Sequence, residues 1–140
     1  VTIATMEAGI TGVRRVFYDA TAEASGGSSK SFHEKVFVKN TNGTTDLLAA
    51  KIQGTSDPSG NLAFDLEDAA DDNNSVANRV TSPAGGDMLG SPTFNDSQKS
   101  VPGTNLASGE AIGVWLKLTL AAGTSAAKTT YTLQVTGTTT

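Results

Sequence analysis

The most restrictive feature of this sequence is a strict alternation of apolar and polar residues between positions 111 and 120. One set of alternate positions holds Ile112, Val114, Leu116, Leu118 and Leu120. The other set holds Gly113, Trp115, Lys117 and Thr119. Successive side chains of a β-strand point to opposite faces, so this pattern predicts a strand with one face in a core.

A second alternating run follows, in which Tyr131, Leu133 and Val135 are predicted to point inward. A loop of small residues that includes Gly123 separates the two runs. Two alternating runs joined by a glycine-containing loop are typical of a β-hairpin. We therefore predict that residues 111–120 and 131–135 form a hairpin at the centre of an antiparallel sheet.

Weaker versions of this pattern occur earlier in the chain. They predict strands at 12–19, 32–39, 47–53, 62–66 and 76–80. In the strand at 32–39, Phe32, Val36 and Val38 are expected to face the core. Turn signals separate several of these segments, among them the dipeptide Asn42-Gly43 and the run 56–60.

Together the segments predict an all-β fold, namely an antiparallel β-sandwich of six to eight short strands without a substantial helix. The strand number does not separate an immunoglobulin-like sandwich from a jelly roll. The 140 residues have the size of a single domain. Within it, we expect residues 1–11 to form an extended N-terminal arm and residues 138–140 to form a frayed tail.

Composition argues against several classes of function. The formal net charge is −4, whereas a nucleic-acid-binding surface needs a basic stripe. The chain contains no cysteine, which excludes disulfides, thiolate metal sites and a cysteine nucleophile. No apolar stretch reaches the roughly 20 residues that cross a bilayer, and the sequence starts without the pattern of a signal peptide. We therefore expect neither a nucleic-acid nor a membrane partner.

His33 is the single histidine, so a Ser-His-Asp site would have to use it. It lies in a predicted strand beside Glu34, and the chain has no Gly-x-Ser-x-Gly motif. We interpret His33 as a surface histidine paired with a neighbouring carboxylate. One histidine without cysteine also supplies too few ligands for zinc. The sequence therefore predicts no catalytic residue, no cofactor, no metal site and no enzymatic activity.

An acidic cluster follows the strand predicted at 62–66. Its members are Asp65, Glu67, Asp68, Asp71 and Asp72. Calcium takes carboxylate oxygens from loops, but the spacing does not match an EF-hand. A glycosidase carboxylate pair would need an aromatic sugar platform, which the sequence does not supply. A solvated acidic loop is the favoured interpretation.

Two aromatic residues lie on the faces opposite the main apolar residues of their strands, namely Phe37 and Trp115. They either lie beneath a loop or arm of the same chain or form a contact between subunits, since exposed aromatics mark interfaces. The apolar start of the chain, Val1 and Ile3, could pack within the subunit or reach onto a neighbour. We predict Val1, Ile3, Phe37 and Trp115 as interface residues.

Three segments resemble small structural proteins of tailed bacteriophages. They are 35–41 (Lys-Val-Phe-Val-Lys-Asn-Thr), 106–126 with its Trp-containing strand and Ala-Gly loop, and 131–137, which ends in Gly. Phe17-Tyr-Asp19 and Glu23 fit the opening of the same pattern. The likeness spans about residues 16–137 and is weak between Gly54 and Pro102, where this chain is shorter and more acidic.

The resemblance implies a β-sandwich of the virion without enzymatic activity. It favours a capsid decoration (cement) protein, a homotrimer bound to the major capsid protein on the outer capsid surface. Alternatives are a phage tail, baseplate or fibre module, or a secreted filament subunit that assembles by N-terminal strand exchange. A calcium-dependent or carbohydrate-binding adhesion module is a further alternative, based on the acidic cluster.

Overall fold

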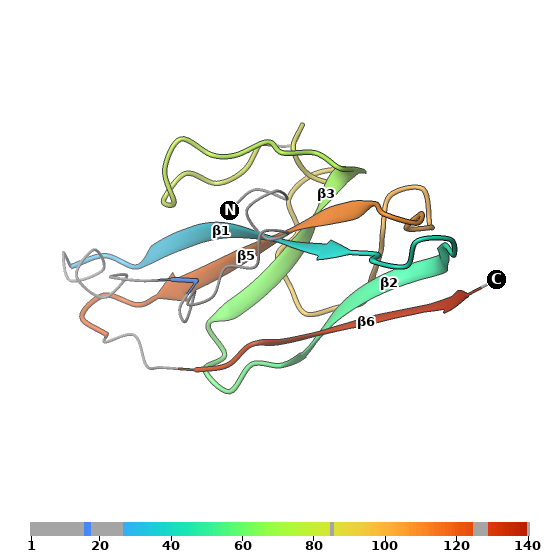
Figure 1. The fold of residues 1–140 in the computed structure, drawn as a ribbon. Coiled ribbons are helices and arrows are strands. Elements are labelled where there is room, and N and C mark those ends of the chain that lie inside the picture. The colour runs from blue at the N-terminus through green and yellow to red at the C-terminus, as the bar shows by residue number, and fades with distance from the viewer. Residues whose placement is uncertain (1–15, 18–26, 85, 125–128, 140) are drawn as a thin grey trace.

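The computed structural model describes residues 16–17, 27–84, 86–124 and 129–139, which form six antiparallel strands and no helix. The strands are β1 (Lys30–Lys39), β2 (Leu47–Ser56), β3 (Leu62–Ala70), β4 (Lys99–Ser100), β5 (Ala111–Leu120) and β6 (Thr132–Thr139). They form two three-stranded sheets: sheet 1, in the order β1-β5-β3, and sheet 2, in the order β4-β2-β6. The sheets pack against each other as the two layers of the predicted β-sandwich (Figure 1).

Consecutive strands always lie in opposite sheets, because the chain crosses between the sheets after each strand. β5 therefore pairs with β1 and β3, whereas β6 pairs with β2. The hairpin predicted for 111–120 and 131–135 is wrong, although β5 is the central strand of its sheet. Alternation indicates which side chains a strand buries, but a glycine-containing loop can cross between sheets as well as join paired strands.

The core lies between the inner faces of the two sheets. The residues of β5 that were predicted to point inward are all buried: Ile112, Val114, Leu116, Leu118 and Leu120. Residues 112, 114 and 116 pack with Phe64 and Leu66 of β3 and with Ala50 and Ile52 of β2. A smaller cluster forms where Phe32 of β1 meets Leu118 and Leu120. Burying this apolar surface, at about 25 cal/mol per Å², is the main force that holds the sheets together.

The strands predicted at 32–39, 47–53 and 62–66 are confirmed as β1, β2 and β3, each extended by a few residues. Residues 76–80, in contrast, form no strand. Thr138 and Thr139, expected in a frayed tail, pair with Leu48 and Leu47, because β2 is long enough to offer them partners. The predicted arm 1–11 and all but two residues of the predicted strand 12–19 lie outside the described residues.

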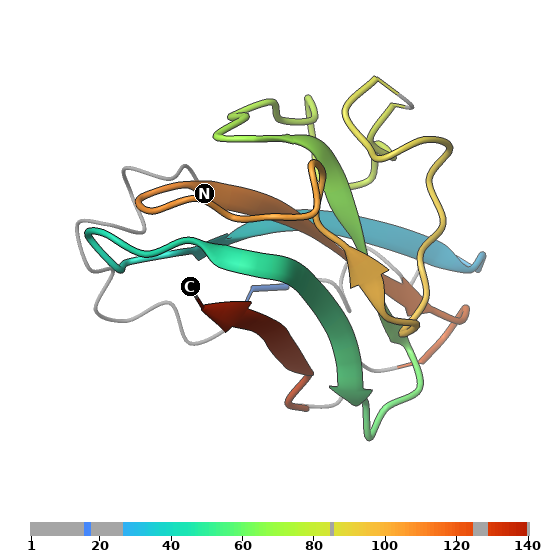
Figure 2. The same ribbon diagram turned by 90° about the vertical axis from the view of Figure 1, so that its right-hand side faces the viewer.

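Residues 71–98, called the crossover below, connect β3 to β4 and are described except for residue 85. The crossover passes over the face of sheet 1 that points away from sheet 2 (Figures 1 and 2). Backbone hydrogen bonds attach it to the strands of sheet 1 at three places: His33 to Arg79, Leu66 to Leu89, and Phe64 to Asn95. Sheet 1 is therefore covered on both faces.

Candidate functional site

Phe37 and Trp115 lie on the outer face of sheet 1, the side of the crossover. Phe37 is 8% exposed and Trp115 is 2% exposed, so of the two alternatives the structure shows the first, in which these aromatic side chains are covered within the same chain. The crossover supplies a cover that the alternation within β1 and β5 does not reveal. We therefore no longer assign these two residues to a contact between subunits. Val1 and Ile3, the other two predicted contacts, lie outside the described residues.

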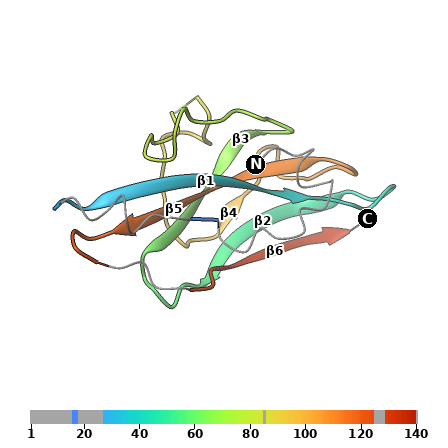
Figure 3. The ribbon, with the colours of Figure 1, turned by 60° about the vertical axis from the view of Figure 1, so that its left-hand side comes forward.

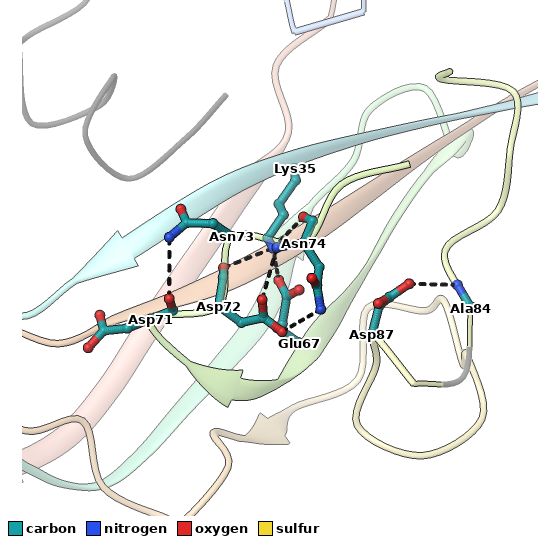
Figure 4. A network of polar contacts seen from close by, with 8 residues as sticks. All are labelled: Lys35, Glu67, Asp71, Asp72, Asn73, Asn74, Ala84 and Asp87. Carbon is teal, nitrogen blue, oxygen red and sulfur yellow. Dashed lines mark hydrogen bonds and ion pairs between the residues drawn. The ribbon is translucent and has the colours of Figure 1, made fainter. Parts of the chain in front are cut away.

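Lys35 of β1 is the centre of a buried polar network on the same face (Figure 4). Its Nζ atom forms an ion pair with Oε2 of Glu67 on β3. It also donates hydrogen bonds to the backbone carbonyls of Asp72, at 3.0 Å, and Asn74, at 2.9 Å. Lys35 is 5% exposed and Glu67 is fully buried. The three protons of the ammonium group thus have acceptors, and one side chain joins β1, β3 and the start of the crossover.

Gly113 of β5 makes room for this ion pair. It pairs with Phe37 in the β1–β5 ladder, and a Cβ atom here would overlap Oε2 of Glu67 and Cε of Lys35. The ring centroids of Phe37 and Trp115 lie 5.2 and 5.4 Å from Nζ of Lys35, within cation–π range. The lysine and the glutamate come from the two outer strands of sheet 1. They meet across the central strand because its residue at this point has no side chain.

Burial dominates the electrostatics of Glu67. It raises the pKa of the carboxyl group to about 7, although the Lys35 ammonium acts in the opposite direction. The charges of Asp72 and Asp87 add to the rise. Among the described residues, Oε1 of Glu67 has no hydrogen-bond partner. An ionised carboxylate at this position therefore depends on Lys35 for its compensation.

A second buried pair holds the other end of the crossover. Nζ of Lys99 lies 2.7 Å from Oδ1 of Asp65, which is 2% exposed. Oδ2 of Asp65 accepts a hydrogen bond of 2.6 Å from the backbone N–H of Thr93, and Lys99 donates to the Thr93 carbonyl. Lys35–Glu67 and Lys99–Asp65 thus fix the two ends of the crossover to sheet 1.

The five carboxylates of the acidic cluster point to different places. Those of Asp65 and Glu67 form the buried ion pairs, so the interpretation of the whole cluster as a solvated loop is wrong for these two residues. Asp71 accepts a hydrogen bond from the Ala111 N–H at 2.9 Å, Asp72 caps its own turn, and Asp68 is exposed. Among the described residues, no three histidine or acidic side chains are grouped so that they could hold a metal ion.

His33 is buried rather than exposed, contrary to the interpretation from the sequence. Its ring packs against Phe94, with 5.4 Å between the centroids, and its backbone N–H donates to the Arg79 carbonyl. Burial lowers the pKa of the imidazole, and the Lys117 ammonium lowers it further. In the described part of the chain, Nδ1 has no hydrogen-bond partner. The surroundings are those of a packed side chain, without the orienting partner that a general base requires at this nitrogen.

The pattern of the sequence does not predict the Lys35–Glu67 pair. Alternation in the strand predicted at 32–39 places Lys35 beside Phe37 on the face away from the core, and Glu67 was expected in a solvated loop. The cover over this face belongs to an irregular segment without periodicity, so neither burial was predicted. One signal was present: Gly113 interrupts the strand, and a glycine inside a strand marks a close approach. That signal does not say which side chains approach.

The Lys35–Glu67 pair is a structural contact that holds the crossover against sheet 1. An amine and a carboxyl group neutralise each other beneath the crossover, and both are almost closed to solvent. Their positions fix the crossover to the sheet. They leave no open acid, base or nucleophile within the pair.

The part of the chain that the structure describes contains no helix long and apolar enough to cross a membrane. Comparisons with known proteins do not assign the chain to a family: no protein-family model, no curated protein and no solved structure matches it. The resemblance to phage structural proteins therefore stays a prediction. A functional proposal depends on that resemblance and on the physical properties of the sandwich.

Proposed function

We propose that this chain is a non-enzymatic structural protein of a bacteriophage particle, where it acts as a capsid decoration (cement) protein. It binds the major capsid protein on the outer shell, as a homo-oligomer for which the resemblance implies a trimer. The observation that carries the proposal is the resemblance of residues 35–41, 106–126 and 131–137 to phage structural proteins. These segments include the second half of β1, all of β5 and most of β6.

The physical properties of the chain support this role. A protein that reinforces a shell must keep its shape under load. Here a core packs the two sheets together, and two buried ion pairs hold the crossover against sheet 1. The net charge of −4 helps to keep a densely covered particle dispersed. A small module that touches several capsid subunits gains affinity from multiple contacts.

The location and the copy number in purified particles test the proposal. Mass spectrometry of heads separated from tails is expected to find the chain in a fixed ratio to the major capsid protein. Undecorated shells should bind the purified chain saturably and should then open at a higher temperature, whereas shells that already carry it should bind no more. Presence in tails alone, or no binding to undecorated shells, would contradict the proposal.

Two alternatives keep their own tests. A tail, baseplate or fibre module would be found in tails rather than heads. A secreted filament subunit needs a free strand edge as acceptor, and β6 offers one among the described residues. Deletion of residues 1–6 should abolish polymerisation of such a subunit but only weaken the docking of a decoration protein.

A further inference from the structure

Four strand edges border the two sheets, and three of them are guarded. The edge of β1 is covered by the crossover, where the Arg79 carbonyl accepts a hydrogen bond of 2.6 Å from the His33 N–H. The edge of β3 forms an isolated bridge between Phe64 and Asn95. β4 has only two residues. Coverage and shortness are two of the devices that keep a strand edge from pairing with another chain.

β6 is the exception. It has eight residues and pairs on one side with β2, and no hydrogen bond from any other described residue reaches its second side. Figure 3 shows β6 along the border of the sandwich, beyond β2. Its sequence, Thr-Leu-Gln-Val-Thr-Gly-Thr-Thr, contains no charged residue and no proline. The edge is therefore long, has no cover from the described residues, and lacks the residues that normally prevent pairing.

We propose that β6 is an assembly edge that pairs with β6 of a second copy of this chain. Two antiparallel copies of the strand would join the two copies of sheet 2 into one continuous sheet about a two-fold axis. Because the strand is uncharged, no register places like charges opposite each other, and its threonines can meet as cross-strand pairs. Val135, which is 40% exposed, lies in this strand and would be partly covered.

The chemistry of the edge favours a second copy over a partner of another kind. A nucleic acid or an acidic segment would need basic residues along the strand, and a basic segment would need acidic ones. β6 offers neither, whereas its uncharged edge fits an identical uncharged edge. The contact should be weak, because two eight-residue strands bury far less than the roughly 1,200 Å² of a stable interface.

This inference does not depend on the capsid proposal, and its two-fold contact differs from the trimer that the resemblance implies. Sedimentation velocity on the full chain, over a series from micromolar to about millimolar concentration, tests it. We expect a reversible equilibrium between monomer and dimer. The double substitution Gln134→Glu/Thr136→Glu should raise the dissociation constant at least tenfold. Glutamate is chosen because Lys51 lies opposite Thr136 within sheet 2, where a new carboxylate is tolerated.

A matched control adds the same charge elsewhere. Ser91→Glu/Gln98→Glu changes two exposed crossover residues and should leave the dissociation constant within twofold. Urea midpoints of both variants equal to that of the unsubstituted chain would show that folding is unaffected.

Three outcomes overturn the inference: a monomer at every concentration, a dimer that both double variants weaken equally, and a trimer or open-ended polymer that survives the β6 charges. Association that disappears only when residues 1–6 are deleted would likewise assign the contact to the N-terminal segment. Binding of a strictly monomeric chain to capsids would reject this contact and leave the decoration proposal standing.

Discussion

The two sheets of this sandwich differ in how their surfaces are closed. Sheet 1 is covered on both faces, by the core on one side and by the crossover on the other, and it encloses a lysine–glutamate pair. In the part of the chain that the structure describes, sheet 2 has no comparable cover, and seven of the eight residues of β6 are exposed. The crossover thus closes sheet 1 and makes no backbone hydrogen bond with β6. Strands with similar alternation can therefore have opposite roles, one in holding the fold together and one in contact.

The difference also predicts where the molecule is sensitive. A buried ion pair is weak evidence for stability, because desolvation offsets much of its attraction, but removal of one partner leaves the other charge uncompensated. Single substitutions in sheet 1 should therefore lower the free energy of unfolding more than comparable substitutions in sheet 2.

Replacement of the central lysine should have the largest effect. Lys35→Ala removes the partner of the buried Glu67 carboxylate and the donor to two crossover carbonyls. We expect a loss of about 3–5 kcal/mol in the free energy of unfolding, measured by urea titration above the Glu67 pKa of about 7, where the carboxyl group is ionised. Lys30→Ala, an exposed lysine of the same strand, should change it by less than about 0.5 kcal/mol.

A double substitution separates charge from packing. Lys35→Met/Glu67→Met removes both charges and keeps long apolar side chains, so it should recover part of the stability that Lys35→Ala loses. If the double variant were no more stable than Lys35→Ala, the unpaired charge would not be the cause of the loss.

The pH dependence of stability should carry the signature of Glu67. Its pKa is raised from 4.5 to about 7 in the folded chain, so the folded state holds this proton more tightly than the unfolded state. The resulting stabilisation is complete below about pH 4.5 and is lost as the pH rises through about 7, by at most about 3 kcal/mol. The difference in unfolding free energy between the wild type and Glu67→Gln should therefore fall between pH 5 and pH 8. A difference that rises with pH would mean that Lys35 outweighs burial.

A methyl group at two glycines compares the sheets directly. Gly113→Ala forces apart two nearly inaccessible side chains and should cost about 1–3 kcal/mol. Gly54→Ala in β2 brings its Cβ to 2.5 Å from the Tyr131 hydroxyl, but that side chain is only partly buried and can move outward. We expect about 1 kcal/mol or less there, and less still for Gly43→Ala, which meets no atom within 4 Å. Equal losses of unfolding free energy at Gly113 and Gly54, measured by thermal unfolding, would contradict the expected difference between the two sheets.

The smallest effect on folding should come from β6. Gln134→Glu/Thr136→Glu lies on an exposed strand, so the unfolding free energy at low protein concentration should change by less than about 0.5 kcal/mol. Chemical denaturation of a dilute sample checks this. A loss above 1 kcal/mol would show that β6 contributes to the fold more than its exposure indicates.

The sequence predicts the strands better than their arrangement. The alternation of Leu116 and Leu118 with polar residues specifies the buried face of β5, because side-chain direction is a local property with a period of two. Pairing is not local: β5 pairs with β1 across a sequence separation that runs from Lys30 to Leu120. Nothing in either strand identifies the other as its partner, so the hairpin prediction failed where the local pattern succeeded.

At the candidate site, too, the sequence predicts the local direction of side chains but not their non-local contacts. The alternation placed Lys35, Phe37 and Trp115 each on the outer face of its own strand, which is where they lie. It could not predict their burial, because the cover comes from the irregular crossover and from a contact between Lys35 and two backbone carbonyls. Backbone carbonyls occur at every residue, so sequence alone cannot single out these two as acceptors.

Hydrogen exchange in the full chain tests the contrast between the sheets most directly. At low concentration, amides of β5 are expected to exchange only through global unfolding, while the amides of β6 that point away from β2 exchange almost as in an unfolded chain. Raising the concentration should protect those β6 amides and leave β5 unchanged. Strong protection of every β6 amide in the dilute monomer would contradict the account, because the edge would then already have a partner.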